Sequence, residues 1–331
     1  MNLKLISFLI LLTRFVAIAE NTSIKRPLRG LATMGSSRDL RNGQFNALKE
    51  ARVHPGIYSG VVICTTWGML EPERGTYDFS SIEMALDDIR QYNKEYPESP
   101  MAGKLRISPA MNSPEWLLKL AGGPVEIILN SGRKVKIGLY WTTEYRQAWK
   151  ELQQNLAERY DDHDLVREVT VNSGATITGE PFISILNKPT VVNLHAKGYT
   201  DSAFKNTLEG ALEDYAPWKK TVLDFSFNVL HETDGGRRRL NMDFTLSLMK
   251  KFRMRYGDRA VIANHGLQAH LEPAAVPIYK AFLELGVPIA AQTVSQKTLT
   301  DESIQVGITA GFLTVPQLEQ YHPVIKANLD T

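Results

Sequence analysis

Carboxylate, amide, imidazole and indole side chains follow the strand-like segments of this 331-residue chain. These residues are Trp67, Glu71, Asn112, Trp116, Glu180, His231, Glu232, Asn264, His265 and Gln292. Flat aromatic faces stack on the C–H surface of a sugar ring, while amides and carboxylates form hydrogen bonds with its hydroxyl groups. Two carboxyl groups could also divide general acid and general base work between them. The mixture predicts a site for a carbohydrate partner.

The sequence gives less support to a metal site, a serine nucleophile or a reactive cysteine. His231, His265 and His270 with Glu232 could form a site of zinc type. A single histidine near a strand end is more often a hydrogen-bonding residue, so we expect no metal and no cofactor. The sequence has no Gly-x-Ser-x-Gly segment to hold a serine nucleophile. Cys64 is the only cysteine, which excludes an intramolecular disulfide, and its apolar strand predicts an inert core residue.

Strand-like and helix-like segments alternate along the chain. Short apolar or β-branched runs predict strands at 31–34, 59–66, 104–110, 166–171, 221–230, 259–263, 289–292 and 311–315. Apolar stripes of helical spacing predict helices from Ser80 onward and at 143–160, 202–215, 242–256, 274–285 and 301–310. Ser80 and Glu83 have the spacing of a capping box. Eight strand–helix units favour a single (β/α)₈ TIM barrel.

The barrel is expected to fill residues 20–331 as one domain, because no linker rich in Pro, Gly and Ser divides the chain. A doubly wound sheet is the alternative, but no glycine-rich phosphate turn follows the first strand. Residues 122–140 have the pattern of a β-hairpin turned at Asn130-Ser131-Gly132. Its position after the third strand predicts an insertion on the face that carries the active site in barrel enzymes.

Residues 1–19 have the features of a signal peptide. Lys4 precedes an apolar run from Leu5 to Thr13, and Ala17-Ile18-Ala19 has the small-x-small form that precedes a cleavage site. The run is shorter than the ~20 residues that a membrane span needs. We therefore expect a secreted or periplasmic protein that has no membrane association once the signal is removed.

The charge of the chain is nearly balanced. There are 38 Lys and Arg residues against 36 Asp and Glu residues, a formal net charge of +2. No strong overall field would draw the protein to nucleic acid, so we expect no nucleic-acid partner.

The segment from Trp67 to Ser80, WGMLEPERGTYDFS, resembles a stretch that follows the second strand in clan A glycoside hydrolases, notably the β-galactosidase-like families. The matching residues are Trp67, Glu71, Pro72, Gly75, Tyr77, Phe79 and Ser80. The resemblance implies a TIM barrel and a glycosidase acting on an oligo- or polysaccharide, and residues 1–19 imply that it acts outside the cytoplasm. It also implies that this segment shapes the sugar site without supplying the catalytic acids.

Clan A enzymes are retaining and use two carboxyl groups ~5–5.5 Å apart. The resemblance places the acid/base after the fourth strand, usually as Asn-Glu. Glu180-Pro181 occupies that place here, with Gly179 where the asparagine would stand. Glu180 is therefore the predicted general acid/base, and we expect partial burial to raise its pKa.

The family's nucleophile, a glutamate ending the seventh strand, is replaced here by Gln292. An amide cannot form the glycosyl–enzyme ester, which leaves three alternatives. Glu232 could reach in from the fifth strand. Glu232 or Asp234 could act as the base of an inverting reaction, with carboxyl groups ~6.5–9.5 Å apart. Otherwise the barrel binds carbohydrate without cleaving it. The predicted sugar-lining residues are Trp67, Glu71, Asn112, Trp116, Asn264, His265 and Gln292.

Overall fold

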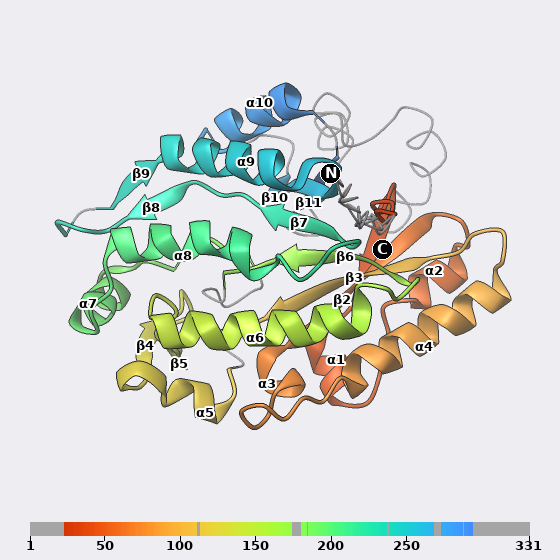
Figure 1. The fold of residues 1–331 in the computed structure, drawn as a ribbon, viewed down its shortest axis with the longest axis horizontal. Coiled ribbons are helices and arrows are strands. Elements are labelled where there is room, and N and C mark those ends of the chain that lie inside the picture. Colours follow the sequence, from red (N-terminus) through yellow and green to blue (C-terminus); the bar gives the residue numbers. More distant parts are fainter. Residues whose placement is uncertain are drawn as a thin grey trace, which may run out of the picture.

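The computed structural model describes residues 23–110, 113–173, 180–183, 185–236, 238–267, 273–286 and 288–293. Seven parallel strands form one sheet in the order β1-β2-β3-β6-β7-β10-β11 (Figure 1). Their bounds are Leu31–Met34, Tyr58–Thr66, Ala102–Ser108, Val166–Val171, Val222–Ser226, Ala260–Leu267 and Ile289–Thr293. The strands of this sheet are neighbours in chain order, which is the winding of a barrel and not of a doubly wound sheet.

Arg106 on β3 shows that the sheet is strongly curled. Its Nη1 atom lies 2.9 Å from Oε1 of Gln292 on β11 and 3.4 Å from Sδ of Met34 on β1. Three strands separate β3 from β11 in the sheet. In a flat sheet these two strands would be about 19 Å apart, at roughly 4.8 Å per spacing, far beyond the reach of an arginine side chain. The predicted eighth strand, 311–315, lies outside the described residues.

Helices cover the outer face of the sheet. The longer ones are α4 (Ser80–Glu95), α6 (Thr143–Tyr160), α7 (Lys188–Ala196), α8 (Asp201–Asp214), α9 (Met242–Tyr256) and α10 (Val276–Leu285). Shorter turns are α1 (Ser37–Arg41), α2 (Lys49–Val53), α3 (Trp67–Leu70), α5 (Glu115–Leu118), η1 (Leu120–Gly122) and η2 (Gly257–Arg259). In Figure 1, α6 and α8 lie side by side, as do α9 and α10. No described helix combines the length and apolarity needed to cross a membrane.

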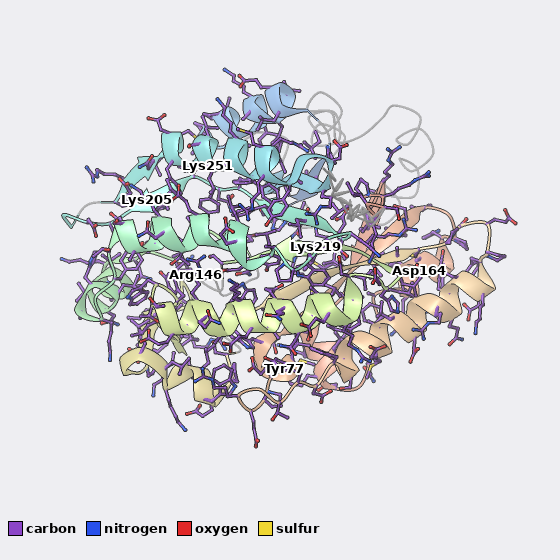
Figure 2. All side chains as sticks on the ribbon, in the orientation of Figure 1. Tyr77, Arg146, Asp164, Lys205, Lys219 and Lys251 are labelled. Carbon is purple, nitrogen blue, oxygen red and sulfur yellow. The ribbon has the colours of Figure 1, made fainter. Side chains whose placement is uncertain are left out.

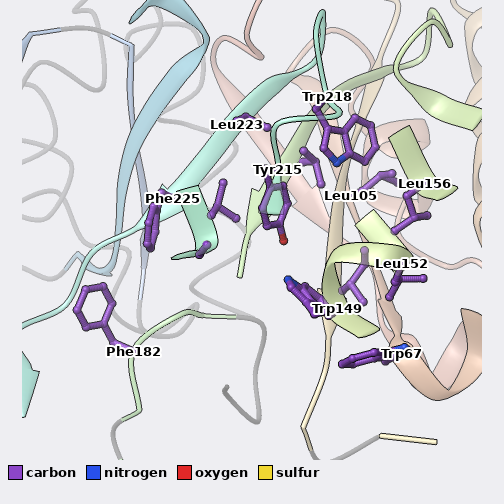
Figure 3. Packing of buried hydrophobic residues seen from close by; sticks show 14 of the residues in the cluster. Trp67, Leu105, Trp149, Leu152, Leu156, Phe182, Tyr215, Trp218, Leu223 and Phe225 are labelled. Atoms are coloured by element: carbon purple, nitrogen blue, oxygen red, sulfur yellow. The ribbon is translucent and has the colours of Figure 1, made fainter. Parts of the chain in front are cut away.

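The main core lies between the sheet and these helices. Trp149 and Leu152 of α6 and Leu105 of β3 are fully buried there, together with Tyr215 and Trp218 (Figure 3). Burying one large apolar side chain contributes ~1.5–3 kcal/mol, so this layer holds the strands that carry the site in their positions.

Two antiparallel hairpins project from the sheet. The first pairs β4 (Val125–Ile128) with β5 (Lys134–Ile137), between β3 and α6 in the chain. It packs on α7, where the Thr190 hydroxyl accepts the Ile128 amide at 2.9 Å. The second pairs β8 (Leu230–Glu232) with β9 (Arg239–Asn241).

Two local predictions were wrong. The segment 221–230 is not one strand, because the sheet strand ends at Ser226 and Leu230 begins the second hairpin, its amide bonded to the Thr245 hydroxyl at 3.0 Å. Ser80 and Glu83 do not form a capping box. Asp78 accepts the Ser80 amide at 2.9 Å, while Glu83 binds Arg159 at 2.7 Å.

Candidate active site

Glu180, in the segment after β6, brings together side chains from the ends of several strands. Its Oε1 atom lies 2.9 Å from Nδ1 of His265 on β10. Its Oε2 atom accepts a 3.4 Å hydrogen bond from Nδ2 of Asn228, two residues beyond the end of β7. The Glu180 side chain is 26% exposed. The carboxylate is thus held by the protein and still accessible from outside.

Arg106 completes this group from β3, on the far side of His265. Its Nη2 atom lies 3.1 Å from Nε2 of His265, and its Nη1 atom donates to Gln292. A guanidinium has no acceptor, so Nε2 of His265 must accept this bond. The role of Nδ1 toward Glu180 depends on the protonation state of the ring. Burial and the charge of Arg106 lower the pKa of His265, which favours a neutral ring.

The pKa of Glu180 is lowered, contrary to the predicted rise. Burial alone would raise it, but the hydrogen bond from His265, the positive charges of a protonated His265 ring and of Arg106, and the Asn228 amide together outweigh burial. Each of these favours the ionised form. The site therefore holds a carboxylate at neutral pH.

Asn264 supports the site from behind and does not line it. Its Nδ2 atom donates to the Phe227 carbonyl at 2.8 Å and to Asn228 Oδ1 at 3.2 Å. Its Oδ1 atom accepts from the Gly266 amide at 2.8 Å and from the Tyr279 hydroxyl at 3.0 Å. Asn264 is buried and its amide group is fully used. The prediction that it contacts sugar is corrected: it fixes Asn228, which contacts Glu180.

His265 and Gln292 are the predicted residues that the structure brings to Glu180 and Arg106. Arg106 and Asn228 were not predicted. A signal for Arg106 is present in the sequence, because Lys104 and Arg106 are two apart within an otherwise apolar strand. Side chains two apart share one face of a strand, so charges at that spacing indicate a polar barrel interior.

An ion cluster lies on the same inner face. Lys104 Nζ is 2.7 Å from Asp224 Oδ2 and 3.9 Å from Glu168 Oε2, and all three side chains are buried. Glu168 Oε1 also accepts the Leu28 amide at 2.7 Å. Burial raises the pKa of Glu168 to about 7. The barrel interior therefore carries formal charges as well as apolar groups.

Trp67 and Glu71 belong to the core, which corrects their predicted place in the sugar-lining shell. Trp67 is fully buried, with its ring 5.0 Å from that of Trp149. Its Nε1 atom donates to Glu71 Oε2 at 2.8 Å, and Glu71 Oε1 accepts the Gly75 amide at 2.9 Å. The motif thus closes a loop at α3 onto the helix layer, and both carboxylate oxygens are occupied.

Trp116 is half-buried beside this loop. Its Nε1 atom donates to the Glu71 carbonyl at 3.0 Å, and its ring meets that of Trp67 edge-on at 6.0 Å. A sugar-binding role for Trp116 stays a prediction. Asn112 and His270 lie outside the described residues.

Glu232 and Glu180 have different sets of partners. Glu232 lies in the β8–β9 hairpin, accepts from Asn241 Nδ2 at 2.8 Å and pairs with Lys205 and Arg239. Figure 2 shows Lys205 at the hairpin end of the molecule. Hydrogen bonds from Lys205 and Asn241 lower the pKa of Glu232.

Glu180 belongs neither to a group of metal ligands nor to the groove at the start of α4, as far as the described residues go. Among the described residues, no three His, Cys, Asp or Glu side chains are grouped so that they could hold a metal ion. An open groove of about 700 Å³ lies instead at the start of α4. It is lined by Tyr77, Asp78, Phe79, Ser80, Glu83, Met84, Asp87 and Arg159.

Comparison with known proteins supports the resemblance to clan A. Residues 50–183 match the sequence profile of glycoside hydrolase family 42, described as beta-galactosidase. The catalytic domain of beta-amylase from Paenibacillus polymyxa is 11% identical, with a TM-score of 0.53 over 87% of this chain and 90% of that one. That likeness shows the fold, and together with the singly wound, curled sheet it supports a TIM barrel.

Two other solved structures are more distant in shape. Endo-glycoceramidase II from Rhodococcus sp. is 15% identical, with a TM-score of 0.46 over 82% of this chain and 75% of that one. A GH5_18 protein from Bifidobacterium longum subsp. infantis is 14% identical, with a TM-score of 0.44 over 81% and 69%. No curated protein matches the chain.

Proposed function

We propose that this protein is a glycoside hydrolase acting on an oligo- or polysaccharide, with Glu180 as general acid/base. The observation that carries the proposal is the position of Glu180, where a partly exposed carboxylate meets His265 and Asn228 at the ends of two neighbouring strands. In barrel enzymes the reacting groups lie at this end of the strands. The match of residues 50–183 to a beta-galactosidase family supports the same class of substrate.

Glu232 is the proposed second carboxylate, acting as base for water in an inverting reaction. Its pairing with Lys205 favours the ionised form that a base requires. We expect Glu232→Gln to lower kcat about 100-fold or more, because general base catalysis contributes ~10²–10⁴-fold. A lower melting temperature with unchanged kcat would instead assign Glu232 to the hairpin alone.

The proposed location is outside the cytoplasm, on the strength of the signal-like residues 1–19. Expression of the full chain with amino-terminal sequencing of the exported protein tests this. The expected result is a mature protein that begins near Glu20. Accumulation of the unprocessed chain in the cytoplasm would contradict it.

Replacement of Glu180 tests the proposed reaction. Wild type and Glu180→Gln are compared on aryl glycosides and polysaccharides by release of aglycone or reducing ends. We expect the amide variant to lose ~10²–10⁴-fold in kcat, since it cannot carry the proton. The control is Glu158→Gln, an exposed position on α6, which should leave the rate unchanged. Unchanged turnover by Glu180→Gln would remove Glu180 from the mechanism.

A second candidate function is carbohydrate binding without cleavage. Two observations favour it: Gln292 stands where the family nucleophile is expected, and the pKa of Glu180 is lowered, which leaves little acid at neutral pH. Calorimetric titration of the same saccharides distinguishes the two functions. Binding by wild type without release of reducing ends supports the second, and turnover supports the first.

A further inference from the structure

Arg106 occupies a central place in the barrel interior. It is 7% exposed, and its two terminal nitrogens reach β10 and β11 from β3. A buried arginine is costly unless hydrogen bonds compensate it. In this barrel those bonds go to His265, to Gln292 and to the sulfur of Met34, all near the ends of their strands.

We propose that Arg106 is a positioning residue that holds His265 in its Nδ1-protonated tautomer and so directs a hydrogen-bond donor at Glu180. The inference rests on the proposed function, since it concerns the same carboxylate. Arg106 acts through His265 and need not touch a substrate.

The argument for the tautomer is one of donors and acceptors. Arg106 Nη2 carries hydrogens only, so a ring proton on Nε2 would set two donors against each other at 3.1 Å. The same tautomer would leave an unprotonated Nδ1 facing a carboxylate oxygen at 2.9 Å, two acceptors without a proton between them. Protonation at Nδ1 satisfies both contacts. The hydrogen bond that His265 Nε2 accepts from Arg106 thus determines that Nδ1 carries the ring proton.

Charge supports the same arrangement. Arg106 lies next to His265 and disfavours a second positive charge on the ring. Gln292 offers Arg106 a neutral oxygen, so the guanidinium charge is not cancelled there. The negative charge of Asp224 favours a charged ring, but Asp224 is paired with Lys104. Glu180 faces the charge of Arg106 across His265, and Asn228, which donates to the same carboxylate, is neutral.

The test reads the tautomer directly. Ring ¹⁵N chemical shifts of the full-length protein are recorded over about pH 5–8, and His265 is assigned by its loss in His265→Gln. In wild type we expect a protonated Nδ1, an unprotonated Nε2 and no charged form at pH 7. A charged ring at pH 7 or a proton on Nε2 would overturn the proposal, and this result requires no variant of Arg106.

Arg106→Met and Arg106→Lys then test the cause. We expect Arg106→Met to mix the two tautomers and to move the titration of the Glu180 carboxyl, followed by infrared difference spectra against Glu180→Gln, to higher pH. Arg106→Lys, which keeps a charge and a donor, should restore part of the wild-type state. The control Arg90→Met removes an exposed arginine of α4. An unchanged tautomer and titration in a folded Arg106→Met would overturn the proposal. Because these readouts need no turnover, they stand apart from a failure of the proposed function.

Discussion

A neutral imidazole between a guanidinium and a carboxylate defines the chemistry available at the residue scale. In such a chain the charge of Arg106 acts on Glu180 without a direct contact, and Glu180 rests in its ionised form. If Glu180 is the proposed general acid/base, it must take up a proton before it can protonate a leaving group. Its protonation state therefore ties the rate to pH.

We predict an acidic pH optimum. If Glu180 is the general acid, only the protonated fraction reacts, so kcat/KM falls as pH rises through its lowered pKa. Measurement of kcat/KM on an aryl glycoside from about pH 3 to pH 8 shows this fall. Asn228→Ala removes one hydrogen bond to the Glu180 carboxylate, so the fall in kcat/KM should move to higher pH. A kcat/KM that rises through the same pH range would show that Glu180 acts first as a base.

At the scale of the element, the segment from Trp67 to Ser80 contributes to the core, because Trp67 packs there against Trp149. Its motif predicted the family resemblance, which the match of residues 50–183 confirms. The motif did not predict which side chains face a ligand. The sequence shows that residue 67 is a tryptophan, but not whether its indole is buried or free to stack on a sugar. Only the packing of Trp67 against Trp149 and Tyr145 decides between them.

Glu71→Ala should lower stability and leave substrate binding unchanged. The substitution removes the acceptor of the Trp67 indole and of the Gly75 amide. A buried donor without a partner costs ~1–3 kcal/mol. Thermal unfolding and KM are measured together, with Glu73→Ala as the exposed control in the same loop. A raised KM at unchanged melting temperature would instead show that Glu71 contributes to substrate binding.

Most of the sheet could be predicted from the sequence, because buried parallel strands are continuous apolar runs. The predicted fifth strand ends too late, since Leu230 continues the apolar pattern although the chain has by then left the sheet for the hairpin. Glu180 could be placed from its position after the fourth strand. The spacing of Lys104 and Arg106 indicates a polar barrel interior, but one strand does not reveal that Arg106 meets Gln292, more than 180 residues later in the chain.

At the scale of the whole molecule, the curled sheet encloses charges that a flat sheet would leave to solvent. Lys104, Glu168 and Asp224 come from three neighbouring strands and meet inside the barrel. Two carboxylates share one ammonium group there. Burial raises the pKa of Glu168 to about 7, and the negative charge of the nearby Asp224 adds to that rise.

The contribution of Glu168 to stability should therefore fall as pH rises from about 4 to about 7. The folded-state pKa of Glu168 lies above the ordinary value of ~4.3, so in that range the folded chain binds more protons than the unfolded chain. Glu168→Gln cannot titrate and should gain stability relative to wild type over this range, by on the order of 3 kcal/mol. Gln keeps an acceptor for the Leu28 amide, and Lys104 keeps Asp224 as its partner.

Urea unfolding at about pH 4.5, 6 and 8 measures this difference. The exposed Glu98→Gln serves as the control, because a surface carboxylate should change the slope of stability with pH very little. Parallel pH curves for wild type and Glu168→Gln would show that Glu168 titrates alike in both states. In that case Lys104, Glu168 and Asp224 would all be ionised. Lys104 and the Leu28 amide would then compensate the cost of burying the Glu168 carboxylate.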